Sequence, residues 1–300
     1  MSRDPLLDVL KGIVDNQLSA VVPTNIAFIV GSNPSKGARS PRLWNAAFCD
    51  LQIDGAMFPL DVSSNEVERL ATVLEQDQRV IGVAIASPYK SHFAKIFSGQ
   101  LSLAAQRSGS INLLSRQSVD RFIGSNTDGL AAVESLLELE PKLAEKTVLI
   151  LGCGATGRAV IASLLDFVDS ERISVVYRNP EHKKWLEGVG VRSSPISSVS
   201  SMLGDKSVLI NCTSMGWGSQ VDVSPLTISN LGLLPSESMV FDVVYQPDPS
   251  KLLIDAHSLG LRTLSGSRMN LLQAVVAFCT ANPTAKREVV VESMQVASMK

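Results

Sequence analysis

Short apolar runs alternate along the chain with longer segments in which apolar residues recur every three or four positions. The runs have the composition of buried strands, and the periodic segments have the spacing of helices with one apolar face. Strands are predicted at 26–30, 80–86, 110–114, 147–151, 173–177, 208–211 and 240–244. Helices are predicted after Pro41, from Val67, after Asp128, and at 158–167, 269–280 and 286–298. Strands and helices in this alternation are typical of an α/β fold with parallel sheets.

The pattern leaves two segments open. Residues 1–20 are amphipathic, with apolar Leu6, Leu10 and Ile13, which fits either a helix packed on the surface or a frayed tail. The serine-rich stretch 193–201 favours a loop beside a short helix.

The size and composition of the chain indicate a globular protein, more often of two domains than of one. It has 300 residues, with 27 lysines and arginines against 29 aspartates and glutamates, and a formal net charge of −2. This balance excludes the basic signature of a general nucleic-acid-binding protein. Apolar residues make up 45% and charged residues 19%, which is enough for a packed core and argues against global disorder.

The sequence carries no signal for a membrane, a metal or a disulfide framework. No apolar run approaches the roughly 18–20 residues of a membrane span, and residues 1–5 lack the basic-then-apolar order of a signal peptide. The four cysteines form no CxxC pair, and the three histidines lie far apart in the sequence. We therefore expect a metal-independent protein of the cytoplasm with reduced thiols.

A glycine-rich turn directly follows the predicted strand 147–151 and leads into a predicted helix. Its glycines, Gly152, Gly154 and Gly157, match the pattern G-x-G-x-x-G. The first glycine permits a tight turn, the second lets the backbone approach a diphosphate, and the third lets helix and strand pack closely. The helix N-terminus then offers N–H groups to the phosphates. The turn predicts dinucleotide binding, and the alternative is a glycine-rich turn without a ligand.

The end of the next strand indicates which dinucleotide binds. An NAD site commonly places an acidic residue there, where it holds a ribose hydroxyl. Here the segment from Val176 to Pro180 reads VYRNP and contains no acid. The guanidinium of Arg178 suits the additional phosphate of NADP, so NADP is predicted over NAD. The alternative is that Arg178 is a solvated loop residue.

Several separated motifs agree with one protein family. They are Asn33-Pro34 leading to Arg39-Ser40-Pro41, Pro88-Tyr89-Lys90, Gly109-Ser110-Ile111-Asn112, Asn126-Thr127-Asp128-Gly129, the glycine turn, Asn211-Cys212-Thr213-Ser214-Met215-Gly216, Asp242-Val243-Val244-Tyr245, and Gly266 followed by Gln273-Ala274. In this order and at these spacings, the chain resembles the shikimate dehydrogenase family over about residues 25–280. Members of that family reduce 3-dehydroshikimate with NADPH or run the reverse reaction.

The resemblance implies two domains. An N-terminal α/β substrate-binding domain would span 1–125 and be completed by C-terminal helices at 265–300, and a Rossmann-like NADP-binding domain with a parallel sheet would span 126–264. The active site would lie in the cleft between them. The expected partner is a small cyclic hydroxy acid, with the protein acting as a monomer or homodimer and binding neither nucleic acid nor membrane.

The resemblance also implies that Lys90 and Asp128 are the catalytic pair. Lys90 would exchange a proton with the substrate oxygen, which a lysine does best when its pKa lies near the working pH. Asp128 would orient Lys90 and bind a substrate hydroxyl. Without the surrounding motifs, Lys90 would be interpreted as a surface lysine and Asp128 as a helix N-cap, a role that is compatible with catalysis.

The other expected site residues follow from the same resemblance. The substrate would be held by Ser40, Asn112, Tyr245 and Gln273, whose hydroxyl and amide groups suit a polyhydroxylated ring. The cofactor would contact Gly152, Gly154, Ala155, Thr156, Gly157, Arg178, Thr213, Ser214, Met215, Val243 and Gly266. The alternatives are a structural hydrogen bond for Gln273 and plain packing for Met215.

The chain departs from the family pattern at three positions near the expected substrate. Ala38 stands where the family has the first serine of Ser-x-Ser-Pro, and Ala84 and Ala86 replace the asparagine and threonine of Asn-Val-Thr. Arg39 is expected to point to solvent, and the alternative is that it points inward and compensates for the missing serine at the substrate carboxylate. The three methyl groups predict a divergent pocket, because each lost neutral hydrogen bond is worth on the order of 1 kcal/mol. The alternatives are an authentic shikimate dehydrogenase that tolerates the alanines, and a non-catalytic NADP-binding regulatory protein of the same fold.

Overall fold

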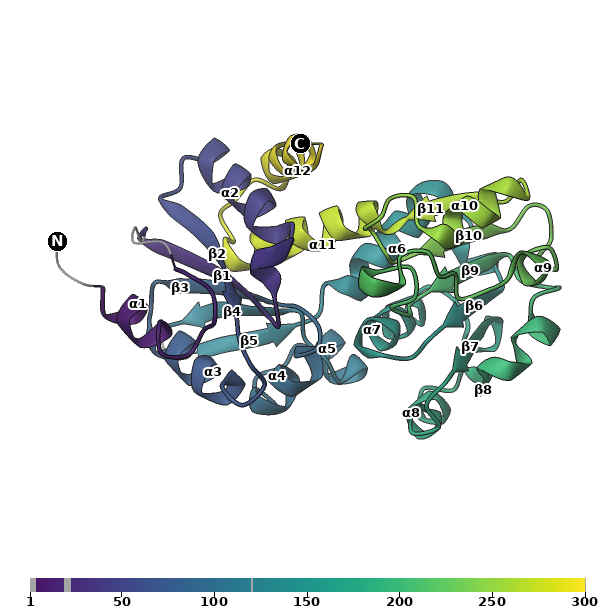
Figure 1. Ribbon diagram of the computed structural model, residues 1–300, viewed down its shortest axis with the longest axis horizontal. Coiled ribbons are helices and arrows are strands. Elements are labelled where there is room, and N and C mark those ends of the chain that lie inside the picture. Colours follow the sequence, from purple (N-terminus) through teal and green to yellow (C-terminus); the bar gives the residue numbers. More distant parts are fainter. Residues whose placement is uncertain (1–3, 19–22, 120, 300) are drawn as a thin grey trace. The chain divides into compact units, whose positions relative to one another are not determined.

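The computed structural model describes residues 4–18, 23–119 and 121–299 (Figure 1). The chain forms two compact units, each with its own sheet. The first unit comprises Met1–Thr127 and Leu271–Lys300, and the second comprises Asp128–Asn270. The helix α11 (Gly266–Ala281) begins in the second unit and ends in the first.

The first unit is built on a five-stranded mixed sheet with the order β2-β1-β3-β4-β5. The strand β1 (Asn25–Gly31) pairs in parallel with β2 (Gly55–Asp61) and β3 (Val80–Ile85). The strands β4 (Leu113–Ser118) and β5 (Arg121–Ser125) are antiparallel to their neighbours. The carboxyl ends of β1, β2 and β3 therefore lie on the same edge of the sheet.

The antiparallel strands β4 and β5 add to the parallel pairing that the alternating pattern predicts. β5 begins at Arg121, directly after β4 ends at Ser118, and so short a connection is possible between antiparallel neighbours but not between parallel ones. The strand expected at 110–114 begins only at Leu113, because the Ile111 N–H donates instead to the Lys90 carbonyl oxygen at 3.0 Å. The apolar pattern also does not predict β2 or β5, which are interrupted by Pro59 and Gly124.

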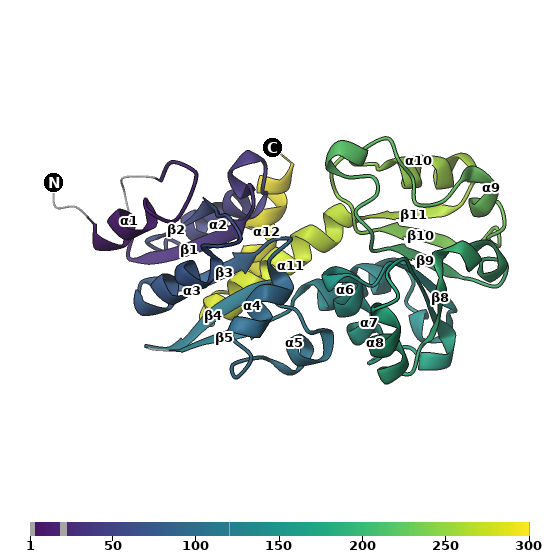
Figure 2. The same cartoon turned by 60° about the horizontal axis from the view of Figure 1, so that its bottom comes forward.

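Alternate side chains of β1 enter two apolar layers, one on each face of the sheet (Figure 2). Ile26, Phe28 and Val30 join the layer whose helices are α1 (Pro5–Leu10), α3 (Val67–Gln76), α4 (Lys90–Ile96) and α5 (Leu103–Ser108). Ala27 and Ile29 join the layer formed by α2 (Ser40–Asp50), α11 and α12 (Arg287–Ser298). This period of two is the geometry of a strand buried on both faces.

The N-terminal segment is packed against the first unit over its described residues. Asp4 caps α1 by accepting hydrogen bonds from the N–H groups of Leu6 and Leu7 at 3.0 and 3.4 Å. Leu10 and Ile13 are buried in the layer that contains α3 and α4. The segment is therefore a packed helix at 5–10, whereas residues 1–3 and 19–22 lie outside the described part of the chain.

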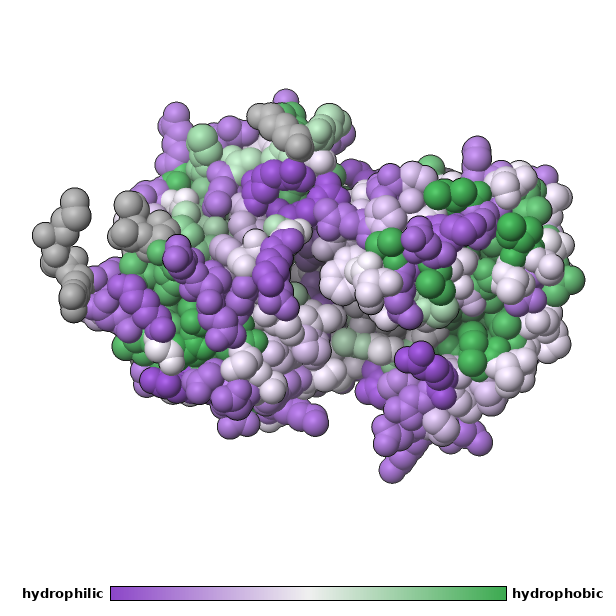
Figure 3. Space-filling view, viewed as in Figure 1, coloured by the Kyte–Doolittle hydropathy of each residue, from purple (hydrophilic) through white to green (hydrophobic). Residues whose placement is uncertain are grey.

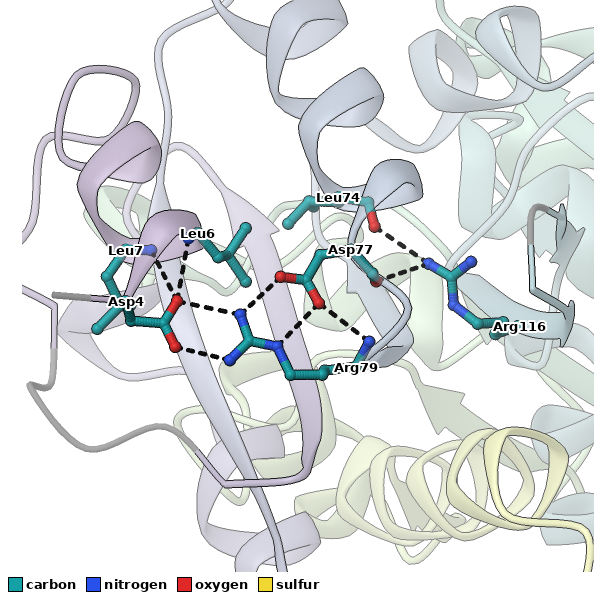
Figure 4. Close-up of polar contacts among 7 residues, drawn as sticks. All are labelled: Asp4, Leu6, Leu7, Leu74, Asp77, Arg79 and Arg116. Carbon is teal, nitrogen blue, oxygen red and sulfur yellow. Dashed lines mark hydrogen bonds and ion pairs between the residues drawn. The ribbon is translucent and has the colours of Figure 1, made fainter. Parts of the chain in front are cut away.

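A charged cluster connects this helix to the start of β3 (Figure 4). The Arg79 guanidinium donates to both carboxylate oxygens of Asp4, at 2.6 and 3.0 Å, and also to both oxygens of Asp77, at 3.0 and 2.7 Å. These hydrogen bonds to Arg79 lower the pKa values of the Asp4 and Asp77 carboxyls. Beside them, Arg116 donates to the carbonyl oxygens of Leu74 and Asp77 at 3.2 and 3.0 Å, which satisfies the end of α3.

The second unit contains a six-stranded parallel sheet with the order β11-β10-β9-β6-β7-β8. Its strands are β6 (Val148–Leu151), β7 (Ile173–Tyr177), β8 (Arg192–Pro195), β9 (Val208–Asn211), β10 (Met239–Asp242) and β11 (Arg262–Ser265). Its α-helices, besides the start of α11, are α6 (Asp128–Leu139), α7 (Ala155–Leu164), α8 (His182–Gly188), α9 (Ile228–Leu231) and α10 (Lys251–Ser258). Counted from β6, the strand order is 3-2-1-4-5-6, the order of dinucleotide-binding folds.

The second unit also corrects two element boundaries. The helix expected at 158–167 begins at Ala155, because the end of the glycine turn forms its first turn. The serine-rich stretch forms the edge strand β8 and the 3-10 helix Ile196–Met202 instead of a loop beside a helix. β8 is short and polar, so it has no apolar run by which it could be predicted.

The surface of the second unit retains some apolar side chains. Ile228, Leu233 and Ile254 are exposed, and Figure 3 shows apolar areas among polar ones on the face drawn. Exposed apolar residues are common on globular proteins and do not by themselves indicate a partner. Of the helices in the described residues, none has the length and apolar composition needed to cross a membrane.

Replacement of Arg79 by methionine tests the charged cluster. At pH 7 we expect the free energy of unfolding to fall by about 1 kcal/mol, because partly exposed ion pairs contribute little more. A carboxyl group with a lowered pKa contributes stability above its unfolded-state pKa and loses it as the pH falls. The difference between the two proteins should therefore shrink below pH 3.8, the ordinary pKa of aspartate.

Urea unfolding at pH 7, 4 and 3 measures this difference. Lys11→Met is the control, because it removes the exposed Lys11–Asp8 pair and should change little. A loss in Arg79→Met that stays constant with pH would contradict the role of the two carboxylates.

Candidate active site

Lys90 is placed by the connections around the end of β3. It is the first residue of α4 and is half-buried. Its carbonyl oxygen accepts a hydrogen bond from the Ile111 N–H at 3.0 Å. The preceding residue, Tyr89, is buried and donates its hydroxyl to the Val62 carbonyl oxygen at 2.7 Å. The backbone of Lys90 is thus held by the segments that follow β2 and precede β4.

Two of the expected substrate residues, Asn112 and Gln273, contact each other in the first unit. The Asn112 side-chain nitrogen lies 3.4 Å from Gln273 Oε1 and donates to Thr127 Oγ1 at 2.9 Å. The Asn112 side-chain oxygen accepts the Thr127 N–H at 2.8 Å, and the Thr127 hydroxyl donates to the Gln273 carbonyl oxygen at 3.2 Å. Thr127 is absent from the expected site residues, although it lies in the Asn126–Gly129 motif that carried the resemblance.

Ser40 follows β1, and the three alanines follow β1 or lie at the end of β3. Ser40 is buried and is the first residue of α2. Ala38, Ala84 and Ala86 are half-buried and pack against the apolar layer of α2, α11 and α12. We call these three methyl groups, which face one apolar layer, the apolar wall.

The expectation that Arg39 points to solvent is wrong. Arg39 is half-buried, and its guanidinium donates to the Ser298 carbonyl oxygen in the last turn of α12 at 3.2 Å. The last carbonyl groups of a helix have no partner within the helix, so they attract such a donor.

Asp128 and Tyr245 belong to the second unit. Asp128 is the buried first residue of α6, and Tyr245 is half-buried shortly after β10. Gly129 lets α6 approach α7 closely, because a Cβ atom there would lie 2.2 Å from the Ala159 carbonyl oxygen. Lys90 lies in the first unit, so its pairing with Asp128 stays a prediction.

All the expected cofactor residues follow strands of the second unit. Gly152, Gly154, Ala155, Thr156 and Gly157 follow β6, Arg178 follows β7, Thr213, Ser214 and Met215 follow β9, Val243 follows β10, and Gly266 follows β11. Because the sheet is wholly parallel, the carboxyl ends of these strands share one edge. In open α/β sheets this edge binds ligands, at the point where the strand order reverses. Here that point lies between β6 and β9.

The glycine turn fits a diphosphate. Gly152 has a φ of +95°, which favours glycine, and a Cβ atom at Gly157 would lie 2.4 Å from the Gly152 carbonyl oxygen. Gly154 differs, because a Cβ atom there would meet nothing within 4 Å and its φ of −72° suits any residue. The fold alone therefore does not require glycine at 154, whereas a ligand close to the backbone would.

A buried polar group holds the loops that follow β9 and β10. Asp242 accepts hydrogen bonds from the Asn211 side chain at 2.9 Å, the Val244 N–H at 3.0 Å and the Ser250 hydroxyl at 2.5 Å. Asn211 Oδ1 in turn accepts the N–H and hydroxyl of Thr213 at 3.0 and 2.7 Å. Burial raises the pKa of Asp242. Asn211 and Asp242 lie in the motifs of the resemblance but had no predicted role.

Two further features surround the glycine turn. Arg158 lies 3.1 Å from His182 Nδ1 and over the Trp185 ring at 5.2 Å, and burial and Arg158 lower the pKa of His182. Arg178 is exposed at the end of β7.

Burial raises the pKa of the Cys153 and Cys212 thiols, which makes them poor nucleophiles. Among the described residues, no group of three or more His, Cys, Asp or Glu side chains could hold a metal ion.

The sequence and structure are similar to those of characterised proteins. Residues 29–114 match the family model described as "Shikimate dehydrogenase substrate binding domain". A protein of Rhodospirillum rubrum named shikimate dehydrogenase (NADP(+)) is 33% identical over 262 residues, which cover 84% of this chain and 90% of that protein. The chain belongs to the shikimate dehydrogenase family. A Pyrococcus abyssi protein of the same name is 32% identical over 248 residues, which cover 82% of this chain and 88% of that protein.

Solved structures of similar proteins have the same two-domain α/β fold. A shikimate 5-dehydrogenase from Thermus thermophilus, in complex with NADP(H) and shikimate, has a TM-score of 0.77 and 25% identity, covering 91% of this chain and 99% of that one. A quinate dehydrogenase from Corynebacterium glutamicum, in complex with NAD, has a TM-score of 0.78 and 22% identity, covering 91% and 99%. The fold predicted from the sequence, with a Rossmann-like domain, is confirmed.

Alanine at Gly154 and at Gly157 separates ligand binding from folding in this member of the shikimate dehydrogenase family. Gly154→Ala should leave the melting temperature nearly unchanged, because its Cβ atom meets nothing. Its affinity for NADPH should fall about tenfold or more, because the methyl group occupies the approach to the diphosphate. Gly157→Ala should instead lower the free energy of unfolding by about 1–3 kcal/mol, because its Cβ atom collides with backbone.

Thermal unfolding and NADPH fluorescence titration measure both effects. Gly204→Ala is the control, because its Cβ atom also meets nothing and it lies on none of the loops that carry the expected cofactor residues. Unchanged NADPH affinity in Gly154→Ala would contradict the assignment of the diphosphate site.

Proposed function

We propose that the protein is an NADP-dependent oxidoreductase that interconverts shikimate and 3-dehydroshikimate, or a closely related pair of cyclic hydroxy and keto acids. The observation that carries the proposal is the 33% identity, over 84% of this chain, to a relative named shikimate dehydrogenase (NADP(+)). We place this activity in the cytoplasm, the compartment that the four free cysteines favour, with the enzyme acting as a monomer or homodimer. The first unit binds the substrate and the second binds NADP.

The assignment of NADP as the cofactor is supported by the edge of the second sheet at which the expected cofactor residues lie. The glycine turn and the start of α7 hold the diphosphate, and exposed Arg178 offers the 2′-phosphate a charged, planar donor. The loops after β9, β10 and β11 border the nicotinamide, and Asp242 and Asn211 fix two of them. When bound, NADP takes up or supplies a hydride.

Lys90 and Asp128 carry the proton transfer in this proposal. During reduction, Lys90 Nζ gives a proton to the carbonyl oxygen of the substrate, and during oxidation it takes the proton from the hydroxyl. Asp128 orients the ammonium group and accepts a hydrogen bond from a neighbouring substrate hydroxyl. The hydrogen bond from Ile111 to Lys90 and the start of α6 fix the backbone at both positions.

We assign substrate recognition to four side chains, two of which, Asn112 and Gln273, already contact each other. Asn112 and Gln273 are fixed relative to each other through Thr127, so they lose little conformational freedom when they bind substrate hydroxyls. Ser40 binds the carboxylate, and Tyr245 contributes a phenol group from the second unit. The apolar wall of Ala38, Ala84 and Ala86 lacks hydrogen-bonding groups, which favours a substrate with fewer or differently placed hydroxyls.

A non-catalytic NADP-binding regulator of the same fold is the second candidate. The apolar wall is the observation in its favour, because it removes contacts with a hydroxylated substrate. The presence of both Lys90 and Asp128 argues against it, because a sensor needs no proton-transfer pair.

Initial rates of NADP⁺ reduction at alkaline pH test the proposed function, with shikimate and quinate each measured with NADP⁺ and with NAD⁺. We expect turnover of shikimate with NADP⁺ and slower turnover with NAD⁺, because Arg178 favours the phosphorylated cofactor. Turnover of quinate alone would assign the pocket to a different cyclic acid. NADPH binding without turnover of either acid would support the regulator.

Lys90→Met tests the proton transfer. It should lower kcat by about 10²- to 10⁴-fold, the usual contribution of a positioned acid or base, while leaving the affinity for NADPH unchanged. Lys95→Met is the matched control, because Lys95 is an exposed lysine on the same helix. A Lys90→Met enzyme with turnover within tenfold of the wild type would refute the role of Lys90.

A further inference from the structure

A buried carboxylate at the end of β2 has no role in the site described above. Asp61 is the last residue of β2 and is only 5% exposed. Both of its carboxylate oxygens accept hydrogen bonds from Ser35: the Ser35 N–H donates to Oδ1 at 2.8 Å, and the Ser35 hydroxyl donates to Oδ2 at 2.5 Å. Hydrogen bonds to a charged carboxylate are stronger than those between neutral groups. Ser35 itself is exposed, so the buried carboxylate ties a surface residue of the 3-10 helix Pro34–Lys36 to the end of β2.

The N-terminal segment fixes the main chain of Asp61. The Asp61 N–H donates to Asn16 Oδ1 at 2.7 Å, and the Asp61 carbonyl oxygen accepts the Asp15 N–H at 2.8 Å. Asn16 also donates its side-chain N–H to the Pro59 carbonyl oxygen at 3.0 Å. The carboxylate therefore projects from a strand end that is secured by a segment outside the sheet.

Ser35 lies in a short, internally hydrogen-bonded loop, residues 33–39, which ends directly before Ser40. The Lys36 N–H donates to the Asn33 carbonyl oxygen at 3.1 Å, and the Ala38 N–H donates to the Pro34 carbonyl oxygen at 3.0 Å. At the far end of the loop, Arg39 donates to the Ser298 carbonyl oxygen at 3.2 Å. The loop is thus held at Ser35 by β2 and at Arg39 by α12, and Ser40 follows directly.

We propose that Asp61 is a positioning residue for the substrate: through Ser35 it holds loop 33–39 so that Ser40 presents its hydroxyl to the substrate carboxylate. The inference rests on the proposed function for the role of Ser40. In this loop Ala38 offers only a methyl group, so Ser40 is the hydroxyl on which carboxylate binding depends. A loop that is ordered before binding loses less conformational freedom when the substrate arrives.

Four variants test the proposal. Asp61→Ala removes both hydrogen bonds, and Ser35→Ala removes only the hydroxyl and spares the buried carboxylate. Ser35→Thr restores a hydroxyl at 35. Asp54→Ala is the matched control, because Asp54 also accepts the N–H and hydroxyl of one residue, Thr24, but lies outside the loop.

The kinetic experiment compares the change in KM for shikimate with the changes in KM for NADP⁺ and in kcat. We expect KM for shikimate to rise about tenfold in Asp61→Ala and about threefold to tenfold in Ser35→Ala, on the scale of lost charge-assisted hydrogen bonds. KM for NADP⁺ and kcat should stay within twofold, Ser35→Thr should recover most of the wild-type KM, and Asp54→Ala should leave it unchanged. A purely structural role predicts a lower melting temperature in Ser35→Ala with no selective change in KM, and that result would overturn the proposal.

Hydrogen exchange of the protein without ligands separates this inference from the proposed function. Ser35→Ala should speed exchange in a peptide covering residues 33–39 several-fold, because the hydrogen bonds of the loop open more often. Asp54→Ala should not change it. A wild-type protein that binds NADPH but turns over neither shikimate nor quinate rejects the proposed function, whereas unchanged exchange in the loop of Ser35→Ala rejects the role of Asp61 and Ser35.

Discussion

Parallel pairing of neighbouring strands is the constraint on which both units depend. In the second unit, six strands share one direction, so the loops that follow them reach one edge of the sheet. Gly152 and Gly266 are remote in sequence and still border the same edge. In the first unit, β1, β2 and β3 share a direction, and the segments after them carry Ser40, Val62 and Lys90. Chemistry assembled from distant segments requires this common edge.

Close approach of backbone segments is what makes the edge of the second sheet compact. Gly157 and Gly266 each sit where a Cβ atom would lie less than 3 Å from a carbonyl oxygen of a neighbouring turn. Asp242 adds a buried anchor that ties the loops after β9 and β10 together through Asn211 and Ser250. A buried, raised-pKa carboxyl group is costly unless it is hydrogen-bonded, and here it accepts three hydrogen bonds. The glycines and this network act together. The glycines have no side chain that would hold the backbone segments apart, and the hydrogen bonds of Asp242 restrict the motion of the loops.

The first unit combines fixed polar groups with an apolar wall. Asn112, Thr127 and Gln273 satisfy one another, so their positions are set before any ligand arrives. The alanine wall offers shape but no hydrogen bonds. In a binding site, amide groups discriminate between ligands more strongly than methyl groups do, because an unpaired polar group is penalised and a methyl contact is not. The three departures from the family pattern all face the apolar layer of α2, α11 and α12.

The sequence by itself determined the elements with a strong local pattern. Strands such as β6, β7 and β9 are short apolar runs, the glycine turn has its own backbone requirements, and α12 has helical spacing throughout. Family resemblance added the candidate residues, including Lys90 and Asp128. The tertiary structure alone decided the antiparallel direction of β4 and β5, the polar edge strand β8, and contacts such as Asn112 with Gln273 and Ser35 with Asp61. These depend on which distant segments pack together, and a local pattern of residues contains no information on the partner.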